Sequence, residues 1–390
     1  MGKQLSPASR AGAGQWPYLR VANVHEGRID YSDVNSMAFS AAERETYGLL
    51  PGDILLNEGQ ENLMMVGRSA LYDGAPGEFC FQNTLIRFRP GPNVLPEFAQ
   101  AVFVWWRANA VFAGIAEKTS ISHLGGSRFG ELLFPLIPVA AQRRIVDVLN
   151  NVTELERGIE ASIAKFHNVR QGSLLASMES VASRRPAAGW ARVPLKDIVP
   201  AAEYGISEAL DRDARGVPVL RMNNIQSVRI DADGLRYCPV PVPSKLFLRR
   251  GDVLFNRTNS MEHIGKAAMW REELPSATFA SYLVRLIPDL QRVIPEYLVE
   301  WLMHPLVRQR VRSISTVAVQ QVNVNPSRLR ELEIDLPVDL AEQRRIVATL
   351  EACDEQIGRE EEELNKLREL KQGLVDDLLS GRVTASGVVA

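Results

Sequence analysis

The sequence of 390 residues lacks the long apolar runs and the cysteine patterns that mark several classes of protein. No run reaches the roughly 18 apolar residues of a membrane span, and Met1–Gln15 has no apolar core typical of a signal peptide. The three cysteines, Cys80, Cys238 and Cys353, include no Cys-x-x-Cys pair, which argues against a disulfide framework and a zinc cluster. We therefore expect a cytoplasmic protein with no membrane span and no metal site.

Catalytic motifs are also missing. The sequence contains no Gly-x-x-x-x-Gly-Lys phosphate loop, no Asn-Pro-Pro-Tyr or Asp-Pro-Pro-Tyr motif of adenine methyltransferases, no His-Glu-x-x-His and no glycine-rich dinucleotide fingerprint. Its five histidines have neither ligand spacing nor a paired acid. We expect no catalytic residue and no cofactor in this chain, and therefore no enzyme.

The net charge of −2 is low for a DNA-binding protein. Proteins that bind DNA on their own usually carry a basic excess, which displaces counterions from the phosphates. The composition leaves two alternatives. Either the chain binds no nucleic acid, or another subunit supplies much of the phosphate contact.

What the sequence does contain is an internal repeat. Gln-Arg-Arg-Ile-Val occurs at Gln142–Val146 and again at Gln343–Val347, an offset of 343 − 142 = 201 residues. A repeat of this length is a domain rather than a solenoid unit, so the chain is a tandem duplication. Further matches pair Gln171-Gly172 with Gln372-Gly373, Leu19–Val24 with Leu220–Ile225, Arg28–Asp30 with Arg229–Asp231, Gly52–Asn57 with Gly251–Asn256, and Val66–Ala70 with Ile264–Ala268.

The better-preserved end of each copy has the pattern of a long helix. Apolar residues recur in alternating steps of three and four, which is the heptad seam of a coiled coil. We place the helices at 139–183 and 339–383 and expect them to pack as an antiparallel coiled coil. Gly172 and Gly373 lie inside them and suggest close helix approach, because a helical glycine costs about 1 kcal/mol relative to alanine. The predicted seam residues are Ile145, Leu149, Val152, Ile159, Ile163, Phe166, Ile346, Leu350, Cys353, Ile357, Leu364, Leu367, Leu374 and Leu378.

The two variable segments, 1–138 and 184–338, have the composition of α+β modules. Short runs rich in β-branched and aromatic residues, such as Asp53–Asn57 and Asp252–Asn256, are separated by Pro and Gly and predict strands joined by turns. Each segment also has a helical patch, Pro96–Phe112 and Pro295–Val311. The predicted fold is therefore α+β: two pseudo-twofold-related modules with mixed β-sheet, separated by the two long helices, with 384–390 as a tail.

This order of modules and Gln-Arg-Arg-Ile-Val helices resembles the DNA-specificity subunit of type I restriction-modification systems. The run Gly251–Asn256 and the ending Lys371-Gln372-Gly373-Leu374 are further features of that family. The resemblance covers nearly the whole chain. One departure concerns the opening Trp190–Leu195 of the second module, typical of the family, which has no counterpart in the 18 residues before Leu19. The first module is then either naturally shortened or begins at an internal start site, and both put its first strand in question.

The resemblance implies that 1–138 and 184–338 are target recognition domains, each reading one half of a bipartite asymmetric site on double-stranded DNA. The helices would act as a ruler between them. It also implies two methyltransferase (modification) subunits as partners and, where one exists, a restriction subunit. S-adenosylmethionine, ATP and Mg would belong to those partners, and this chain would be a non-catalytic specificity subunit. The alternative is a non-catalytic coiled-coil scaffold whose flanking modules bind protein or another ligand.

Residues that read bases should be flexible hydrogen-bonding groups on loops, because Arg suits guanine, Asn and Gln suit adenine, and Ser and Thr are permissive. Each candidate could equally be a turn former. Arg20, Asn23, Arg221 and Asn224 recur in both copies and are better suited to the fold or to backbone positioning. The candidates are Asn57, Gln60, Arg68, Gln82, Asn83, Lys118, Thr119, Ser120 and Ser122 in the first module, and Arg257, Thr258, Asn259, Ser260, Lys266, Ser281, Tyr282, Gln320, Gln321, Asn323 and Asn325 in the second.

Overall fold

The computed structural model describes residues 1–60, 62–117, 122–213, 215–226, 228–317, 321–380 and 382. The chain forms two compact units, Met1–Glu160 with Glu362–Ala390, and Ala161–Glu361. Each unit contains one predicted module, the first half of one long helix and the second half of the other. Within the described ranges, none of the helices has the length and apolar character needed to cross a membrane.

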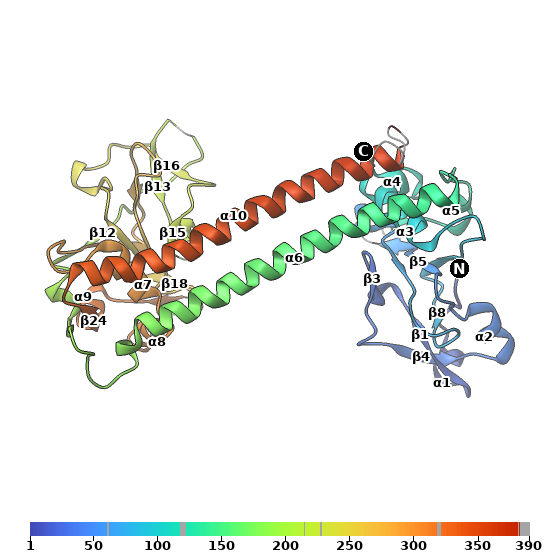
Figure 1. Ribbon diagram of the computed structural model, residues 1–390, viewed down its shortest axis with the longest axis horizontal. Helices are drawn as coiled ribbons and strands as arrows, with labels where there is room; N and C mark the ends of the chain where they lie inside the picture. The colour runs from blue at the N-terminus through green and yellow to red at the C-terminus, as the bar shows by residue number, and fades with distance from the viewer. Residues whose placement is uncertain are drawn as a thin grey trace. The chain divides into compact units, whose positions relative to one another are not determined.

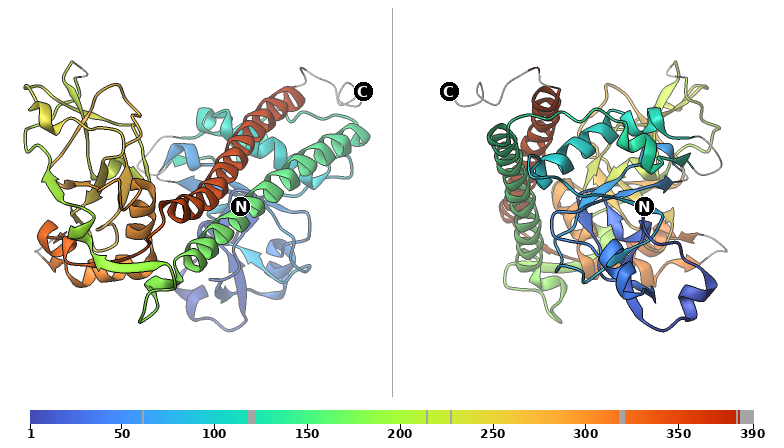
Figure 2. Two further views of the ribbon diagram at one scale, coloured as in Figure 1. Left: turned by 60° about the vertical axis from the view of Figure 1, so that its left-hand side comes forward. Right: turned by 90° about the vertical axis from the view of Figure 1, so that its right-hand side faces the viewer.

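The first unit contains two three-stranded sheets (Figure 1). In one, β1 runs antiparallel to β4 and parallel to β8, and in the other β5 is antiparallel to both β7 and β9. Helix α3 packs on β7, and Figure 2 (right) shows it in teal beside the blue strands. The elements are α1 Pro7–Ala11, β1 Gln15–Leu19, β2 Val24–His25, β3 Arg28–Ile29, β4 Asn35–Ala38, α2 Ala41–Tyr47, β5 Ile54–Asn57, β6 Gly59–Gln60, β7 Ser69–Leu71, β8 Cys80–Phe81, β9 Leu85–Phe88, α3 Pro96–Ala108, α4 Val111–Ile115, β10 Ser122–His123 and α5 Gly126–Gly130.

The second unit repeats this plan and adds strands to it. The sheet order β16-β13-β20 corresponds to β4-β1-β8, and β19-β17-β21 corresponds to β7-β5-β9 with β12 added at the edge. The predicted mixed sheets are therefore present in both modules. The elements are β11 Trp190–Pro194, β12 Ala201–Tyr204, β13 Val217–Leu220, β14 Ile225–Gln226, β15 Arg229–Ile230, β16 Arg236–Cys238, β17 Val253–Asn256, β18 Thr258–Asn259, β19 Ala267–Met269, β20 Thr278–Phe279, β21 Leu283–Ile287, α7 Pro295–Met303, α8 Pro305–Ser313, β22 Thr316–Val317, β23 Val322–Asn323, α9 Pro326–Arg330 and β24 Glu333–Pro337.

Each predicted helical patch of the modules is two helices rather than one. In the second module α7 ends at Met303 because Pro305 follows, and the residue before a proline is disfavoured in the helical region. His304 accordingly has the non-helical angles φ −58 and ψ 132. Its Nδ1 accepts a hydrogen bond from the Leu306 backbone N–H at 3.3 Å, so His304 caps the start of α8.

The buried His304 cap predicts a pH dependence of stability. Burial, followed by the charge of Arg310, lowers the pKa of His304 below its ordinary value of 6.5. A lowered pKa means that the neutral imidazole stabilises the fold above pH 6.5, and that this contribution is lost as the pH falls through the folded-state pKa. His304→Asn keeps a capping acceptor but removes the group that titrates. As the pH falls from about 7.5 to about 5, we therefore expect the variant to lose less stability than the unsubstituted protein. Urea unfolding at both pH values measures this, and parallel losses in the two proteins would contradict it.

Helices α6 (Val139–Ser177) and α10 (Leu340–Leu379) are the two predicted long helices. In the first unit, Ile145 at the start of α6 and Leu378 at the end of α10 belong to one hydrophobic core. In the second unit, Leu174 at the end of α6 and Leu350 near the start of α10 share another core. The start of one helix therefore packs on the end of the other in each unit, which confirms the antiparallel pairing. The pseudo-twofold relation between the modules stays a prediction.

The predicted seam residues all lie on covered parts of the two helices. Polar positions in the seam are paired: Lys371 Nζ lies 2.5 Å from Glu156 Oε2 in the first unit, and Arg170 Nε lies 2.5 Å from Asp354 Oδ1 in the second. Such pairs fix the register of a coiled coil. Buried seam residues are Ile145, Ile346, Leu350, Ile357, Leu364 and Leu378, and partly buried ones are Leu149, Val152, Ile159, Ile163, Phe166, Cys353, Leu367 and Leu374.

The first residue of the repeated pentapeptide attaches each long helix to its module. Gln142 is completely buried; its Nε2 donates to the carbonyls of Asn93 and Ile137, and its Oε1 accepts from the Leu95 N–H, all at 2.8 Å. Gln343 makes the same three bonds, to Arg292 O, Pro337 O and Ile294 N, at 2.8–3.0 Å. The glutamine of the pentapeptide is thus explained by the fold.

The prediction that Gly172 and Gly373 mark a close approach of the two helices is wrong. Both residues are exposed, and a Cβ built on either would meet no heavy atom of the described residues within 4 Å, apart from the helix's own nearby backbone. The seam lies on the other side of each helix, where Phe166 and Arg170 are partly covered. Nothing within the described chain requires glycine at these positions.

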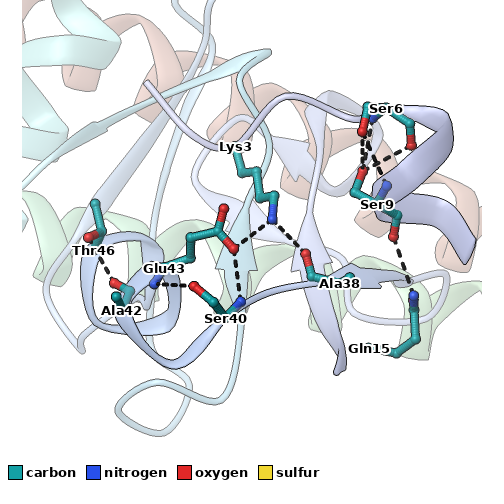
Figure 3. Close-up of polar contacts among 9 residues, drawn as sticks. All are labelled: Lys3, Ser6, Ser9, Gln15, Ala38, Ser40, Ala42, Glu43 and Thr46. Atoms are coloured by element: carbon teal, nitrogen blue, oxygen red, sulfur yellow. Dashed lines mark hydrogen bonds and ion pairs between the residues drawn. The ribbon is translucent and has the colours of Figure 1, made fainter. Parts of the chain in front are cut away.

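The first strand, whose integrity the sequence put in question, is present as β1. The segment before it is held by Lys3, whose Nζ lies 2.7 Å from both the Ala38 carbonyl and Glu43 Oε2 (Figure 3). Ser40 and Glu43 cap α2 reciprocally, which orients that carboxylate. The N-terminal segment is therefore tied to the β4–α2 connection by an ion pair.

The family-type opening of the second module forms a strand pair that the first module does not match. β11 pairs with β24 over five residues, from Trp190 with Pro337 to Pro194 with Glu333. The corresponding described segment of the first module, 131–138, contains no strand. Leu133 is 95% exposed and Leu136 is 63% exposed there, whereas Ile334 in β24 is fully buried. Described residues thus leave Leu133 and Leu136 of the first module uncovered, whereas β11 pairs with the equivalent strand β24 in the second.

Candidate nucleic-acid interface

In the first module the structure brings two of the predicted polar segments together. β6 and β10 form an antiparallel ribbon in which Ser122 faces Gln60 and His123 faces Gly59. Glu58 Oε2 lies 2.9 Å from His123 Nδ1 and joins the two segments through their side chains. Lys118, Thr119 and Ser120 lie outside the described residues. The ribbon gives this module one polar hairpin-like edge.

Gln82 and Asn83 lie between β8 and β9, away from that ribbon in sequence. The Asn83 N–H donates to the Lys3 carbonyl and the Gln82 N–H to the Leu19 carbonyl, so their backbone groups hold the N-terminal segment and β1. Both residues are half-buried, as is Arg68. Their side chains remain candidates for contact at the surface.

Three candidates occupy interior positions instead of the expected loop surface. Asn57 is fully buried at the end of β5, as its repeat counterpart Asn256 is at the end of β17. Ser122 is 6% exposed and Thr258 is 4% exposed. We expected these three residues to be exposed on loops, and that expectation is wrong. The strand ends that carry them are buried. In this conformation they support the fold rather than present groups to a ligand.

The recurring asparagines also have a framework role. Asn23 Nδ2 donates to the carbonyls of Asp30 and Asp33 at 2.9 Å, and its Oδ1 accepts from the Arg20 N–H at 3.0 Å. Asn224 makes the matching bonds in the second module. Both asparagines are buried. The same loop is therefore closed by the same hydrogen bonds in both modules. Asn23 and Asn224 recur because the fold requires them.

In the second module an arginine and two exposed tyrosines form a cluster. The Arg257 guanidinium lies over the Tyr204 ring, 5.1 Å from its centroid, and the Arg257 N–H donates to the Tyr282 carbonyl at 3.1 Å. Tyr204 is 50% exposed and Tyr282 is 46% exposed. Arg257 has no ion pair with any carboxylate in the described part of the chain, and its buried Nε has no hydrogen-bond partner there. The cluster offers an uncompensated cation stacked on an accessible aromatic ring.

Sequence reasoning missed Tyr204 because it lies in a strand 53 residues before Arg257 in the chain, from 257 − 204. The available signal was an aromatic residue directly before Gly205, a residue type typical of turns. Only strand pairing reveals the contact: Tyr204 faces Val284 in β21, which also pairs with β17 just before Arg257. The tertiary arrangement of β12, β21 and β17 thus builds the cluster.

The remaining candidates of the second module lie around β18 and β23. Thr258 Oγ1 donates to Asn323 Oδ1 at 2.6 Å, which joins the two strands, and Asn325 caps α9 by accepting from the Ser327 N–H at 2.8 Å. Gln320 lies outside the described residues. Ser260, Gln321 and Asn325 are exposed, while Asn259, Lys266, Ser281 and Asn323 are half-buried.

The chemistry available on these surfaces is that of recognition. The polar loops present amides, hydroxyls and guanidinium groups, and arginine stacked on an aromatic ring is suited to bases and phosphates. Among the residues that the structure describes, no group of three or more His, Cys, Asp or Glu is placed to hold a metal ion. The fold and surfaces therefore define a duplicated binding protein built on a pair of long antiparallel helices.

Comparison with known proteins shows which class of protein this chain is similar to. A family model of the type I restriction modification DNA specificity domain matches residues 188–369. The chain is 30% identical over 194 residues to a protein named as the MjaX specificity subunit of a type I restriction enzyme, from Methanocaldococcus jannaschii, which covers 49% of this chain and 45% of that protein. It is 21% identical over 403 residues to the type I restriction enzyme EcoBI specificity subunit of Escherichia coli, covering 95% and 80%.

Solved structures share the fold. A chain from a study of complex assembly and conformational transition of the type I R-M system matches with a TM-score of 0.61 and 18% identity, over 93% of this chain and 90% of that one. The HsdS subunit from Thermoanaerobacter tengcongensis matches with a TM-score of 0.50 and 18% identity, over 95% and 91%. The predicted fold class is confirmed. The second module and its helix match the type I restriction modification DNA specificity domain, and the chain is similar to specificity subunits of type I restriction enzymes.

Proposed function

We propose that this chain reads a bipartite, asymmetric sequence on double-stranded DNA, one half-site with each module. The observation that supports this most strongly is a shared framework with unlike polar loops. Asn23 and Asn224 close the same loop, and Gln142 and Gln343 anchor the same helix, in the two copies. The Arg257–Tyr204 stack belongs to the second module alone, since Glu58 stands at the position after Asn57 where Arg257 follows Asn256. Equal frameworks with different surfaces are suited to two different half-sites.

The partners in this proposal are two methyltransferase subunits, which hold S-adenosylmethionine and methylate adenine, and, where one exists, a restriction subunit that uses ATP and Mg. In this proposal the chain determines the sequence specificity and carries no catalytic group. It acts in the cytoplasm. Repeated exposed residues support a partner that binds twice. Val169 and Leu370 occupy equivalent positions of the two helices and are 45% and 65% exposed. Gly172 lies three residues after Val169, and Gly373 three residues after Leu370. Both glycines are exposed and lie on the same side of their helix as the apolar residue. The scaffold alternative is not favoured by the family comparison.

Arg257 is the residue of the second module that we expect to discriminate a base. Replacing it by alanine should reduce binding to the cognate site about ten- to a hundredfold, because a bidentate arginine contact is worth roughly 1–3 kcal/mol. Arg257→Lys should keep the charge and still relax the sequence preference, because an ammonium lacks the planar fork. Binding of the methyltransferase complex to the cognate site and to single-base variants measures both effects.

Arg250→Ala is a matched control, because this arginine is 67% exposed in the same unit and lies 3.9 Å from Glu272. We expect Arg250→Ala to leave the sequence preference unchanged, because a surface charge without a base contact carries no sequence information. An Arg257→Ala protein with the same ratio of cognate to variant affinities as the unsubstituted chain would remove Arg257 from base reading.

Exchange of one module tests the proposed function directly. If residues 184–338 are replaced by the matching module of a relative with another specificity, the methylated motif should change in one half-site only, because each framework folds around its own core. Exchange of 1–138 should change the other half-site. The measurement is sequencing of methylated adenines in cells that express each chimera with the methyltransferase subunit. A change of both half-sites after a single exchange would show that the modules are not independent readers.

A further inference from the structure

One residue position is held in the same way in both modules, and it carries opposite charges in the two. Glu58 follows β5 and Arg257 follows β17, each directly after a buried asparagine. The backbone N–H and carbonyl of both residues bond to equivalent neighbouring segments, so the fold fixes the position and leaves the side chain to vary. The bonds are Glu58 N–H to Thr84 O at 3.0 Å, Leu124 N–H to Glu58 O at 2.8 Å, Arg257 N–H to Tyr282 O at 3.1 Å and Val324 N–H to Arg257 O at 2.8 Å.

The reversal of charge contrasts with the residues around this position. The preceding Asn57 and Asn256 are identical and fully buried, and both carbonyls accept from the N–H of a glycine, Gly67 and Gly265, at 3.0 and 2.9 Å. The framework therefore does not require either a carboxylate or a guanidinium at the next residue. A position with a fixed backbone and a variable charge is suited to tell one base from another.

In the second module this position presents hydrogen-bond donors. The Arg257 guanidinium lies 5.1 Å from the centroid of the Tyr204 ring, and its buried Nε has no hydrogen-bond partner in the described part of the chain. A guanidinium stacked on a ring is held in one plane, and its planar fork matches the O6 and N7 acceptors of guanine. The second module is therefore suited to guanine at this point.

In the first module the same position presents acceptors. Glu58 Oε2 accepts a hydrogen bond from His123 Nδ1 at 2.9 Å, and Glu58 makes no other side-chain hydrogen bond with the described residues. Its side chain is 14% exposed and that of His123 is 43% exposed. An ionised carboxylate only accepts, so it matches the N4 amino group of cytosine and is repelled by the acceptors of guanine and thymine. The N6 and N7 of adenine instead suit an amide, which has both a donor and an acceptor.

We propose that this position selects one base in each half-site, with Arg257 selecting a guanine and Glu58 selecting a cytosine. Tyr204 and His123 are positioning residues, which hold the guanidinium and the carboxylate. The proposal rests on the DNA reading proposed above. It adds which position of each module reads a base and which base that position prefers.

Glu58→Gln tests the first module. Glutamine keeps an oxygen for His123 and adds an amide donor, which suits adenine. We expect the preference for cytosine over adenine to fall at least about tenfold at one base pair of the half-site that depends on residues 1–138. The measurement is binding of the methyltransferase complex to DNA sites that differ at that base pair. Glu45→Gln is the matched control, because Glu45 is an exposed acid of the same module and should leave every preference unchanged.

Two variants of Tyr204 test the second module. Tyr204→Ala removes the ring under Arg257 and should lower the preference for guanine at least about tenfold, at the same base pair that Arg257→Ala affects. Tyr204→Phe keeps the ring and should keep the preference. Combining Tyr204→Ala with Arg257→Ala should relax that base pair no further than Arg257→Ala alone, because the tyrosine acts through the arginine.

The outcomes separate this proposal from the DNA reading on which it rests. A bipartite motif in the unsubstituted chain, with base preferences unchanged by Glu58→Gln and by Tyr204→Ala, would overturn the proposal and leave the DNA reading intact. A uniform loss of affinity for all sequences would also overturn it, because contacts to phosphate carry no sequence information. If the unsubstituted chain gave no motif at all, both would be contradicted. Thermal unfolding shows whether each variant is folded, and if Glu58→Gln is not, the Tyr204 variants decide.

Discussion

Replacing Gln343 by leucine is expected to lower the free energy of unfolding by about 3 kcal/mol or more. The substitution removes three buried hydrogen bonds at once and leaves the Ile294 N–H and the carbonyls of Arg292 and Pro337 without their partner. Each buried backbone group left unpaired costs roughly 1–3 kcal/mol. Leucine has no polar atom that could replace any of these bonds, so the start of α10 should loosen from its module.

Urea unfolding of the full chain measures this effect. Gln142→Leu should show a similar loss, because Gln142 makes the same three bonds in the first unit. Gln372→Leu is the control: Gln372 is exposed on α10, and the change should stay within about 0.5 kcal/mol. Equal stability of Gln343→Leu and Gln372→Leu would show that the pentapeptide glutamines do not hold the helices to the modules.

Insertion of one heptad into both α6 and α10 is expected to lengthen the unread spacer of the DNA site by about three base pairs. Seven residues add about 10 Å to a helix, and base pairs are about 3.4 Å apart along the duplex. Insertion next to the Glu156–Lys371 ion pair in both helices would keep that pair and the heptad phase. The result rests on the proposal that the helices set the distance between two readers.

The spacer is measured from the methylation motif of cells that carry the lengthened chain with its methyltransferase. A control insertion of five residues in each helix turns the following part of the seam by about 140°, away from its partner, and should destabilise the chain rather than give a new spacing. An unchanged spacer in a folded, active heptad variant would rule out the ruler. A longer spacer with both half-sites unchanged would support it.

The long helices could be predicted from sequence because their signal is local. The seam from Ile346 to Leu378 keeps its three- and four-residue steps without any knowledge of the modules, and α10 ends at Leu379, near the predicted end of the pattern. The β5 and β17 strands were likewise predicted from short apolar runs after Asp53 and Asp252. Periodicity and turn residues therefore sufficed for the framework.

The side chains of the interface were harder to predict, since their positions depend on tertiary packing. Asn57 has the composition of a loop residue, yet the sheet covers it completely. Tyr204 reaches Arg257 only through the pairing of β12, β21 and β17. The prediction for Gly172 rested on the cost of a glycine inside a helix. The described residues place no neighbour within 4 Å of the position where its Cβ would lie. A polar residue at a strand end has the same local propensity whether its side chain points inward or outward, so its orientation is set by the tertiary fold.

The central claim is that this chain determines which DNA sequence a methyltransferase modifies. It is tested most directly by single-molecule sequencing of DNA from cells that express the chain together with its methyltransferase subunit, compared with cells that express the methyltransferase alone. The account predicts a new N6-methyladenine motif with two unlike half-sites separated by a fixed unread spacer, and its absence from the comparison cells. Folded and associated proteins that give no such motif, or one that is the same without this chain, would contradict the account.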